Sequence, residues 1–224
     1  VLLCIFGEKG RKRKMKGRAI LNELRYALYI MCHPFDGFWC LKKEKRGTVR
    51  ASLCIMLLLT VLTVVESQET GFILNYNDLN KTNVLQLICS VWIPYFIWCV
   101  ANWCITTLVD GEGSFKDISV TTAYALAPMI LFHVPMLIIS RFIIAEEATF
   151  YYMLAAIAVL WSGFLIFVGL MTVHQFTPGK TLGTMALAVV AMAIILFLAL
   201  LFVTILQQFW AFINVLLKEL SMRR

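Results

Sequence analysis

The longest uncharged stretch of the chain comprises residues 181–217 and reads TLGTMALAVVAMAIILFLALLFVTILQQFWAFINVLL. About 20 apolar residues in a helix are enough to cross a bilayer core of roughly 30 Å. Two further stretches, 118–140 and 148–179, also lack charge and are long enough to cross. A soluble fold rarely buries a helix on all of its faces. These stretches therefore predict a polytopic helical membrane protein.

The composition agrees with this prediction. Hydrophobic residues make up 61% of the 224 residues, well above the near-half share of a soluble domain. The expected fold is all-α, with five transmembrane helices and amphipathic interfacial helices at the N- and C-terminal ends. The predicted spans are 48–67, 84–109, 118–140, 149–173 and 184–206. They form a membrane domain over 48–207, and residues 208–224 form an amphipathic tail or the end of an overlong helix that bends onto the surface.

The charge distribution predicts the orientation. The first 50 residues carry 13 Lys/Arg and four Asp/Glu, a balance of +9, whereas the remainder has seven basic and nine acidic residues. Dense basic residues beside early spans stay in the cytoplasm and attract anionic lipids. We therefore predict a multi-pass protein of the cell membrane, with its basic N-terminal region cytoplasmic and its C-terminus outside. No motif for reading nucleic acid accompanies the basic residues.

The N-terminal segment has the order of a stop-transfer sequence. Residues 1–6 are apolar and the basic run 9–16 follows them, whereas a signal peptide runs basic first. One hypothesis is that residues 1–18 contain the end of a preceding crossing; the other is a frayed apolar N-terminus. Residues 19–47 form a juxtamembrane segment, in which 19–32 have the apolar spacing of an amphipathic helix that ends at His33-Pro34.

Few residues within the spans could carry chemistry. His133 could be a proton relay, a ligand or an interhelical hydrogen-bonding group, but we favour a neutral imidazole bonded to a neighbouring carbonyl. The histidines are isolated and no two cysteines have metal-ligand spacing. Gly111 and Gly113 are interpreted as turn glycines, and Pro128 as a packing kink. We therefore expect no enzymatic activity, no catalytic residues, no metal site and no cofactor.

One motif suggests a family. Residues 110–117 read DGEGSFKD, residues 123–128 read AYALAP, and residues 174–177 read HQFT shortly before Lys180. Over roughly residues 33–207 this pattern resembles the bacterial branch of the Yip family, five-pass proteins whose eukaryotic members work with Rab GTPases. The eukaryotic branch has a Gly-Pro-Leu-Trp-type signature where this chain has Gly113-Ser114-Phe115, so the resemblance does not extend to Rab binding. The candidate partner-contact or signature residues are Asp110, Gly111, Gly113, Phe115, Pro128, His133, His174 and Lys180.

The resemblance implies an interaction module that docks other integral membrane proteins. The first functional hypothesis is a non-catalytic accessory or scaffold subunit of a larger assembly, with the permease subunits of an ABC-type solute (sugar) importer as possible partners. The second is an autonomous transporter or channel, which rests on His133 and the prolines of the third span. The third is a membrane-trafficking or membrane-shaping protein, which rests on the basic N-terminal region.

Overall fold

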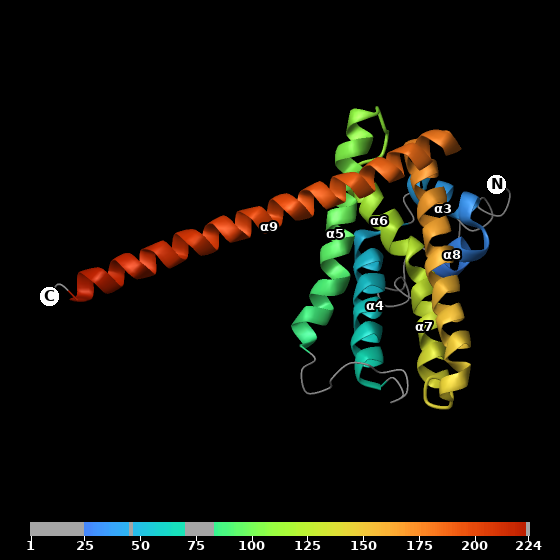
Figure 1. The fold of residues 1–224 in the computed structure, drawn as a ribbon. Helices are drawn as coiled ribbons and strands as arrows, with labels where there is room; N and C mark the ends of the chain where they lie inside the picture. Colours follow the sequence, from blue (N-terminus) through green and yellow to red (C-terminus); the bar gives the residue numbers. More distant parts are fainter. Residues whose placement is uncertain (1–24, 45–46, 70–82, 223–224) are drawn as a thin grey trace, which may run out of the picture.

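The computed structural model describes residues 25–44, 47–69 and 83–222, and in these ranges all regular structure is helical. Five helical segments are long and apolar enough to cross a membrane, which confirms the all-α, five-span prediction (Figure 1). The helices are α3 Pro34–Lys43, α4 Val49–Glu69, α5 Val84–Leu108, α6 Phe115–Ala125, α7 Ala127–Ile139, the 3₁₀ turn η1 Ala145–Glu147, α8 Ala148–His174 and α9 Pro178–Met222.

Local sequence sets where two of these helices begin. Asn83 caps α5, because its side chain accepts a hydrogen bond from the Leu85 N–H at 3.0 Å. Ser114 and Asp117 form a capping box at the start of α6, in which each side chain bonds to the other's backbone N–H. Such caps satisfy N–H groups that have no partner inside a helix. The caps thereby fix the entry points of the second and third spans.

The third predicted span is two helices rather than one. The chain passes from α6 to α7 at Leu126, whose N–H bonds to the carbonyls of Thr122 and Ala123. Pro128 is buried in the first turn of α7. A proline has no N–H to continue the helix and its ring clashes with the preceding turn. The break just before Pro128 therefore agrees with its interpretation as a kink.

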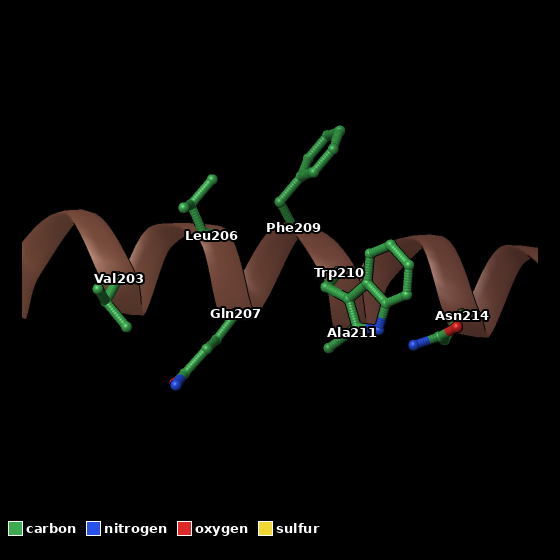
Figure 2. Close-up of a pocket in the computed structure, with 7 residues that line it drawn as sticks. All are labelled: Val203, Leu206, Gln207, Phe209, Trp210, Ala211 and Asn214. Carbon is green, nitrogen blue, oxygen red and sulfur yellow. The ribbon is translucent and has the colours of Figure 1, made fainter. Parts of the chain in front are cut away.

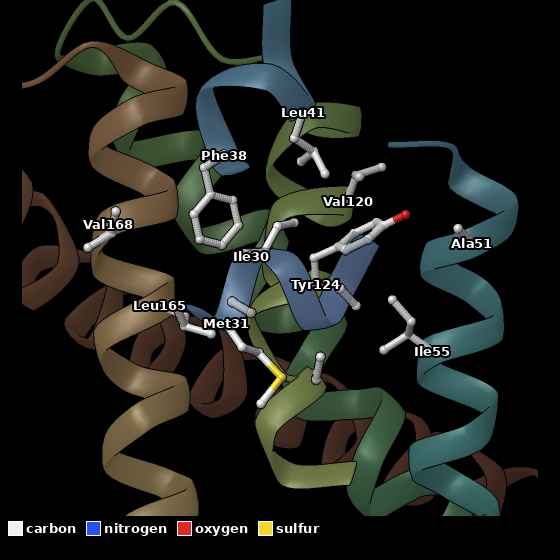
Figure 3. Packing of buried hydrophobic residues seen from close by; sticks show 13 residues of the cluster. Ile30, Met31, Phe38, Leu41, Ala51, Ile55, Val120, Tyr124, Leu165 and Val168 are labelled. Carbon is white, nitrogen blue, oxygen red and sulfur yellow. The ribbon is translucent and has the colours of Figure 1, made fainter. Parts of the chain in front are cut away.

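The N-terminal part of the described chain packs into the bundle. Residues 25–32 are helical as predicted, and His33 separates them from α3. Ile30 and Phe38 are fully buried in a cluster with Tyr124 of α6 (Figure 3). Leu28, on the same helix as Ile30, is 51% exposed. This segment therefore forms part of the core as well as lying at one end of the bundle. The proposed stop-transfer segment 1–18 lies outside the described residues.

Helix α9 is longer than the span predicted over 184–206. It is one continuous helix of 45 residues, which agrees with the overlong helix that was one of the two alternatives for the residues after this span. Thr181, Thr184 and Ala188 are buried, and Figure 1 shows α9 crossing the other helices there and then running away from them. From Leu196 to Phe212 every residue is exposed. Its C-terminal half therefore has no contact surface within the described part of the chain.

Helix α8 packs closely on α6 through Gly169. A Cβ atom on Gly169 would lie 2.5 Å from Cγ2 of Thr121 and 3.2 Å from the ring of Phe38, whereas a Cβ on Gly163 would meet nothing within 4 Å. Small residues allow helix backbones to approach closely in membranes. Helix α8 contains both glycines, but only at Gly169 does close packing exclude a side chain.

This difference predicts opposite effects of the same substitution. Gly169→Ala should lower the free energy of unfolding by about 1–3 kcal/mol, the usual cost of overpacking. Gly163→Ala should raise it by up to about 1 kcal/mol, because alanine favours a helix over glycine. Unfolding in detergent can be followed by the reactivity of the buried thiols of Cys40 and Cys99. Equal effects of the two substitutions would contradict the packing described.

Candidate functional site

The loop between α5 and α6 contains the DGEGSFKD motif and makes a tight turn. Asp110 has a φ of 56°, a left-handed conformation that short polar side chains tolerate. The Val109 and Gly111 N–H groups both bond to the Thr106 carbonyl, at 3.2 and 2.8 Å. The end of α5 is thereby closed by its own loop. The loop then runs toward Gly113, Ser114 and the start of α6.

The two loop glycines are required by the ring of His174. A Cβ on Gly111 would lie 2.6 Å from Nδ1 of His174, and a Cβ on Gly113 would lie 2.6 Å from Cε1 of the same ring. Neither glycine has a positive φ. Both glycines lie in the loop, as their interpretation as turn glycines predicts, but neither is needed there for a left-handed backbone. They let the backbone approach a buried imidazole, and the positive φ of the turn is at Asp110.

His174 is the last residue of α8 and is 2% exposed. Its Nδ1 accepts a hydrogen bond from the Gly113 N–H at 3.3 Å, which places the proton of the neutral ring on Nε2. That Nε2 is buried and has no hydrogen-bond partner within the described ranges. The ring also stacks on Phe176, with 5.3 Å between ring centroids. His174 is thus a packing and hydrogen-bonding group rather than the interfacial cap that its position suggests.

The chain turns sharply after His174. Gln175 has a φ of 56° and caps α8, and the Phe176 N–H bonds to the Met171 carbonyl at 3.1 Å. A left-handed residue at this position is a common way to satisfy the last carbonyls of a helix. The turn places Phe176 against His174 and allows α9 to begin at Pro178, where a missing N–H costs nothing.

Two lysines join this turn to other segments. Lys42 of α3 donates to the Val173 carbonyl at 2.5 Å and lies 3.2 Å from the Glu112 carboxylate. Lys180 of α9 donates to the Val109 carbonyl at 2.9 Å, and its Nζ lies 4.2 Å from the ring centroid of Phe176. Cations near the last carbonyls of a helix are favourable. We call the loop 109–113, the α8–α9 turn and the two lysines the junction.

The junction contains five of the eight candidate residues: Asp110, Gly111, Gly113, His174 and Lys180. The other three lie elsewhere. Phe115 is 38% exposed and packs edge-on against Trp103. Pro128 is at the break between α6 and α7, and His133 lies in α7. The sequence therefore identified the junction residues but not the lysine from α3, which could be found only from the fold.

His133 forms the second polar cluster, toward the far end of the bundle. Its Nδ1 lies 2.6 Å from Oε2 of Glu66 in α4, and the Tyr151 hydroxyl of α8 donates to Oε1 of Glu66 at 2.8 Å. The preferred prediction of a carbonyl partner was wrong, because the partner is a carboxylate. The cluster joins α4, α7 and α8 by interhelical hydrogen bonds, one of the roles considered for His133.

The Glu66 side chain is only 20% exposed. A count along the helices could have found the pair. Glu66 is 17 residues beyond the start of α4 at Val49, and His133 is 18 residues beyond the start of α6 at Phe115. At 1.5 Å per residue the two side chains lie at similar depth in helices that run in the same direction. An exposed pair, Arg141 with Glu69, lies at the same end.

The side chains of both clusters form hydrogen bonds that join helices. No group of three or more His, Cys, Asp or Glu side chains that could hold a metal ion occurs among the described residues. In the junction, each hydrogen bond that involves His174, Lys42 or Lys180 ends on a backbone group or on Glu112. The junction therefore supports a structural role.

The family model of the Yip1 domain matches residues 28–206 of the chain. This match includes the junction and the Glu66–His133 pair, and it begins within the helix that precedes α3. No curated protein and no solved structure matches the chain with statistical significance.

The contact between Gly113 and His174 can be tested by a double-mutant cycle. Gly113→Ala should lower the free energy of unfolding by about 1–3 kcal/mol. The cost should be smaller in a His174→Ala background, because the ring that the new methyl group meets is gone; Cγ1 of Val173, 2.7 Å away, leaves a residual cost. The measurement is unfolding in detergent, with Gly179→Ala as the control because its Cβ would meet nothing within 4 Å. Additive effects would refute the contact.

The Glu66–His133 pair predicts a contrast with the exposed pair beside it. Glu66→Ala should cost about 1.5–3 kcal/mol, the range for hydrogen bonds to charged groups. Arg141→Ala should cost less than about 1 kcal/mol, because Arg141 and Glu69 are both more than half exposed. Thermal unfolding of the two variants in the same detergent would compare them. If Arg141→Ala proves the more damaging, the cluster does not join the helices as described.

Proposed function

This chain belongs to the Yip1 domain family, and we propose that it acts as a non-catalytic scaffold subunit of a larger membrane assembly. The observation that carries the proposal is the C-terminal half of α9, which extends from the bundle with its side chains exposed (Figure 1). A scaffold needs a rigid element that reaches beyond its own fold. A continuous helix that starts from a fixed junction is such an element.

The length of α9 exceeds what a bilayer crossing requires. Its 45 residues correspond to about 68 Å at 1.5 Å per residue, more than twice the roughly 30 Å of a hydrocarbon core. Tilting accommodates a moderately long helix but not an excess of this size. Part of α9 must therefore lie along the membrane surface or pack against another protein.

The polar residues in this half favour a protein partner. Gln207 and Asn214 are seven residues apart, and Figure 2 shows them on the same side as Ala211, opposite Leu206 and Phe209. The hollow beside them is lined only by residues of α9, so it is a surface of one helix and not a ligand cavity. No hydrogen bond to another described residue satisfies either amide. In membranes, such amides bond across helix interfaces beside small residues.

We call Gln207, Ala211 and Asn214 the amide stripe and propose that it contacts a transmembrane helix of the partner. The partner class that we propose is the permease subunits of an ABC-type solute importer, whose transmembrane helices offer surfaces of this kind. This finer proposal extends the expectation drawn from the sequence. Identification of the partner is therefore part of the test.

The test is affinity purification of the full chain from native membranes, followed by mass spectrometry. We expect stoichiometric co-purification of another integral membrane protein. The double variant Gln207→Leu/Asn214→Leu keeps the helix apolar but removes both amides, and should lower the yield of that protein about tenfold or more, since each lost interhelical hydrogen bond costs roughly 1–2 kcal/mol. The matched control is Gln208→Leu, which removes a neighbouring amide outside the stripe and should leave the yield unchanged.

Other outcomes would decide against the proposal. If no membrane protein co-purifies, and the chain alone in liposomes moves a solute in a way that His133→Ala stops, the chain is an autonomous transporter. If a partner co-purifies equally with the stripe variant and the control, docking uses another surface. A partner other than a permease subunit would support the scaffold role and contradict the proposal of an ABC-type importer.

A further inference from the structure

An apolar groove of about 420 Å³ lies between α4, α5, α7 and α9, and we call it the membrane groove. Its lining extends from Met56 to Thr63 in α4 and from Ser90 to Trp98 in α5, with Met192 of α9 at one side. At 1.5 Å per residue these segments are about 10–12 Å long, or two helical turns. The lining contains no Lys, Arg, Asp or Glu. The membrane groove is therefore a surface for apolar side chains.

The outer half of α9 carries apolar side chains with no contact in the described part of the chain. Phe202, Leu206 and Phe209 have the i, i+4, i+7 spacing of one helix face, and each is at least half exposed. Figure 2 shows Leu206 and Phe209 on the side opposite Gln207 and Ala211. We call these three residues the phenylalanine stripe. It is about 10 Å long, which matches the membrane groove, and it lies on a different face from the amide stripe.

The phenylalanine stripe cannot reach the membrane groove of its own chain. Met192 lies at the groove, and α9 then runs away from the bundle (Figure 1). Between Thr184 and Met222 there is neither Gly nor Pro, the residues at which most sharp helix kinks occur. Phe202 is 10 residues beyond Met192, or about 15 Å, which exceeds the 8–10 Å spacing of neighbouring helices. The stripe therefore lies beyond its own bundle, at the distance of an adjacent molecule.

We propose that two copies of this chain associate in the membrane, with the phenylalanine stripe of each copy packed in the membrane groove of the other. Every copy carries both surfaces, so one two-fold axis covers both pairs at once. Residues 196–212 of α9 are uncharged, as is the groove lining, so the contact buries no unpaired charge. Large side chains in a groove provide the van der Waals packing that holds helices together in membranes.

This interface goes beyond the scaffold proposal and is compatible with it. The amide stripe lies on the other side of α9 from the phenylalanine stripe (Figure 2). A second copy on one face therefore leaves the amides free for a different membrane protein. The two contacts can be tested separately, because no residue belongs to both stripes.

The experiment places a photoreactive amino acid at Leu206 of the full chain, which is expressed with a differently tagged second copy in the same membranes. We expect an adduct of twice the chain mass that carries both tags. Mass spectrometry should locate the cross-link at groove residues of α4 or α5 in the second copy. The control position is Leu200, which is seven residues before Gln207 and thus on the face of the amide stripe. It should give no adduct with both tags.

Variants in both surfaces identify the contact. Phe202→Ala/Phe209→Ala should lower the yield of the two-tag adduct at least about fivefold, as expected when aromatic anchors of an interface are truncated. The matched control Phe197→Ala/Phe212→Ala removes the same side chains from other faces of α9 and should leave the yield unchanged. All four phenylalanines are exposed, so neither variant disturbs the bundle. Ser90→Trp fills the membrane groove and should lower the yield as well.

Four results would overturn the proposal. They are lipid adducts alone from Leu206, an adduct with a different protein only, a cross-link within one copy, which keeps the mass of a single chain, and an unchanged yield in the phenylalanine variant. The variant Gln207→Leu/Asn214→Leu should leave the two-tag adduct intact while it lowers recovery of the scaffold partner. Failure of the dimer and failure of the scaffold are therefore distinguishable.

Discussion

In hydrocarbon a backbone N–H or carbonyl finds no water, so each must be bonded within the protein. This constraint makes every span a helix, and it also explains the polar groups at the helix ends. Lys42 bonds to the Val173 carbonyl near the end of α8, and Lys180 bonds to the Val109 carbonyl at the end of α5. Asn83 and Ser114 satisfy N–H groups where spans begin. The side chains that satisfy the helix ends also hold the bundle together, because the two lysines come from α3 and α9.

The polar clusters at both ends of the bundle follow the same constraint. At the junction, His174 accepts from the Gly113 backbone, and this requires two glycines against its ring. At the far end, Glu66 receives hydrogen bonds from His133 and Tyr151. Both clusters bond to groups within the bundle, although Nε2 of His174 has no hydrogen-bond partner within the described ranges. The amide stripe of α9 is different, because its two amides lie on an exposed helix. A polar stripe on a long apolar helix is therefore the feature that points outward from this fold.

Periodicity and charge predicted the helical class and four of the five spans to within a few residues. The break between α6 and α7 was harder to predict. It depends on how the ring of Pro128 meets the last turn of α6. The sequence also pointed to Gly111, Gly113, His174 and Lys180, since an unusual motif near spans is visible without coordinates. It did not reveal Lys42 or Glu66 as partners, because partners across helices depend on depth and rotation. The burial of Ala27, Ile30 and Met31 depends on tertiary packing, which the local spacing of apolar residues does not report.

We propose that the outer half of α9 contacts another membrane protein rather than lipid alone. A photoreactive amino acid in place of Ala211, within the amide stripe, tests it in intact native membranes. We expect one discrete cross-linked protein from this position. We expect none from Leu160, which is 73% exposed on α8. Lipid adducts alone at Ala211, or the same cross-linked products from both positions, would contradict it.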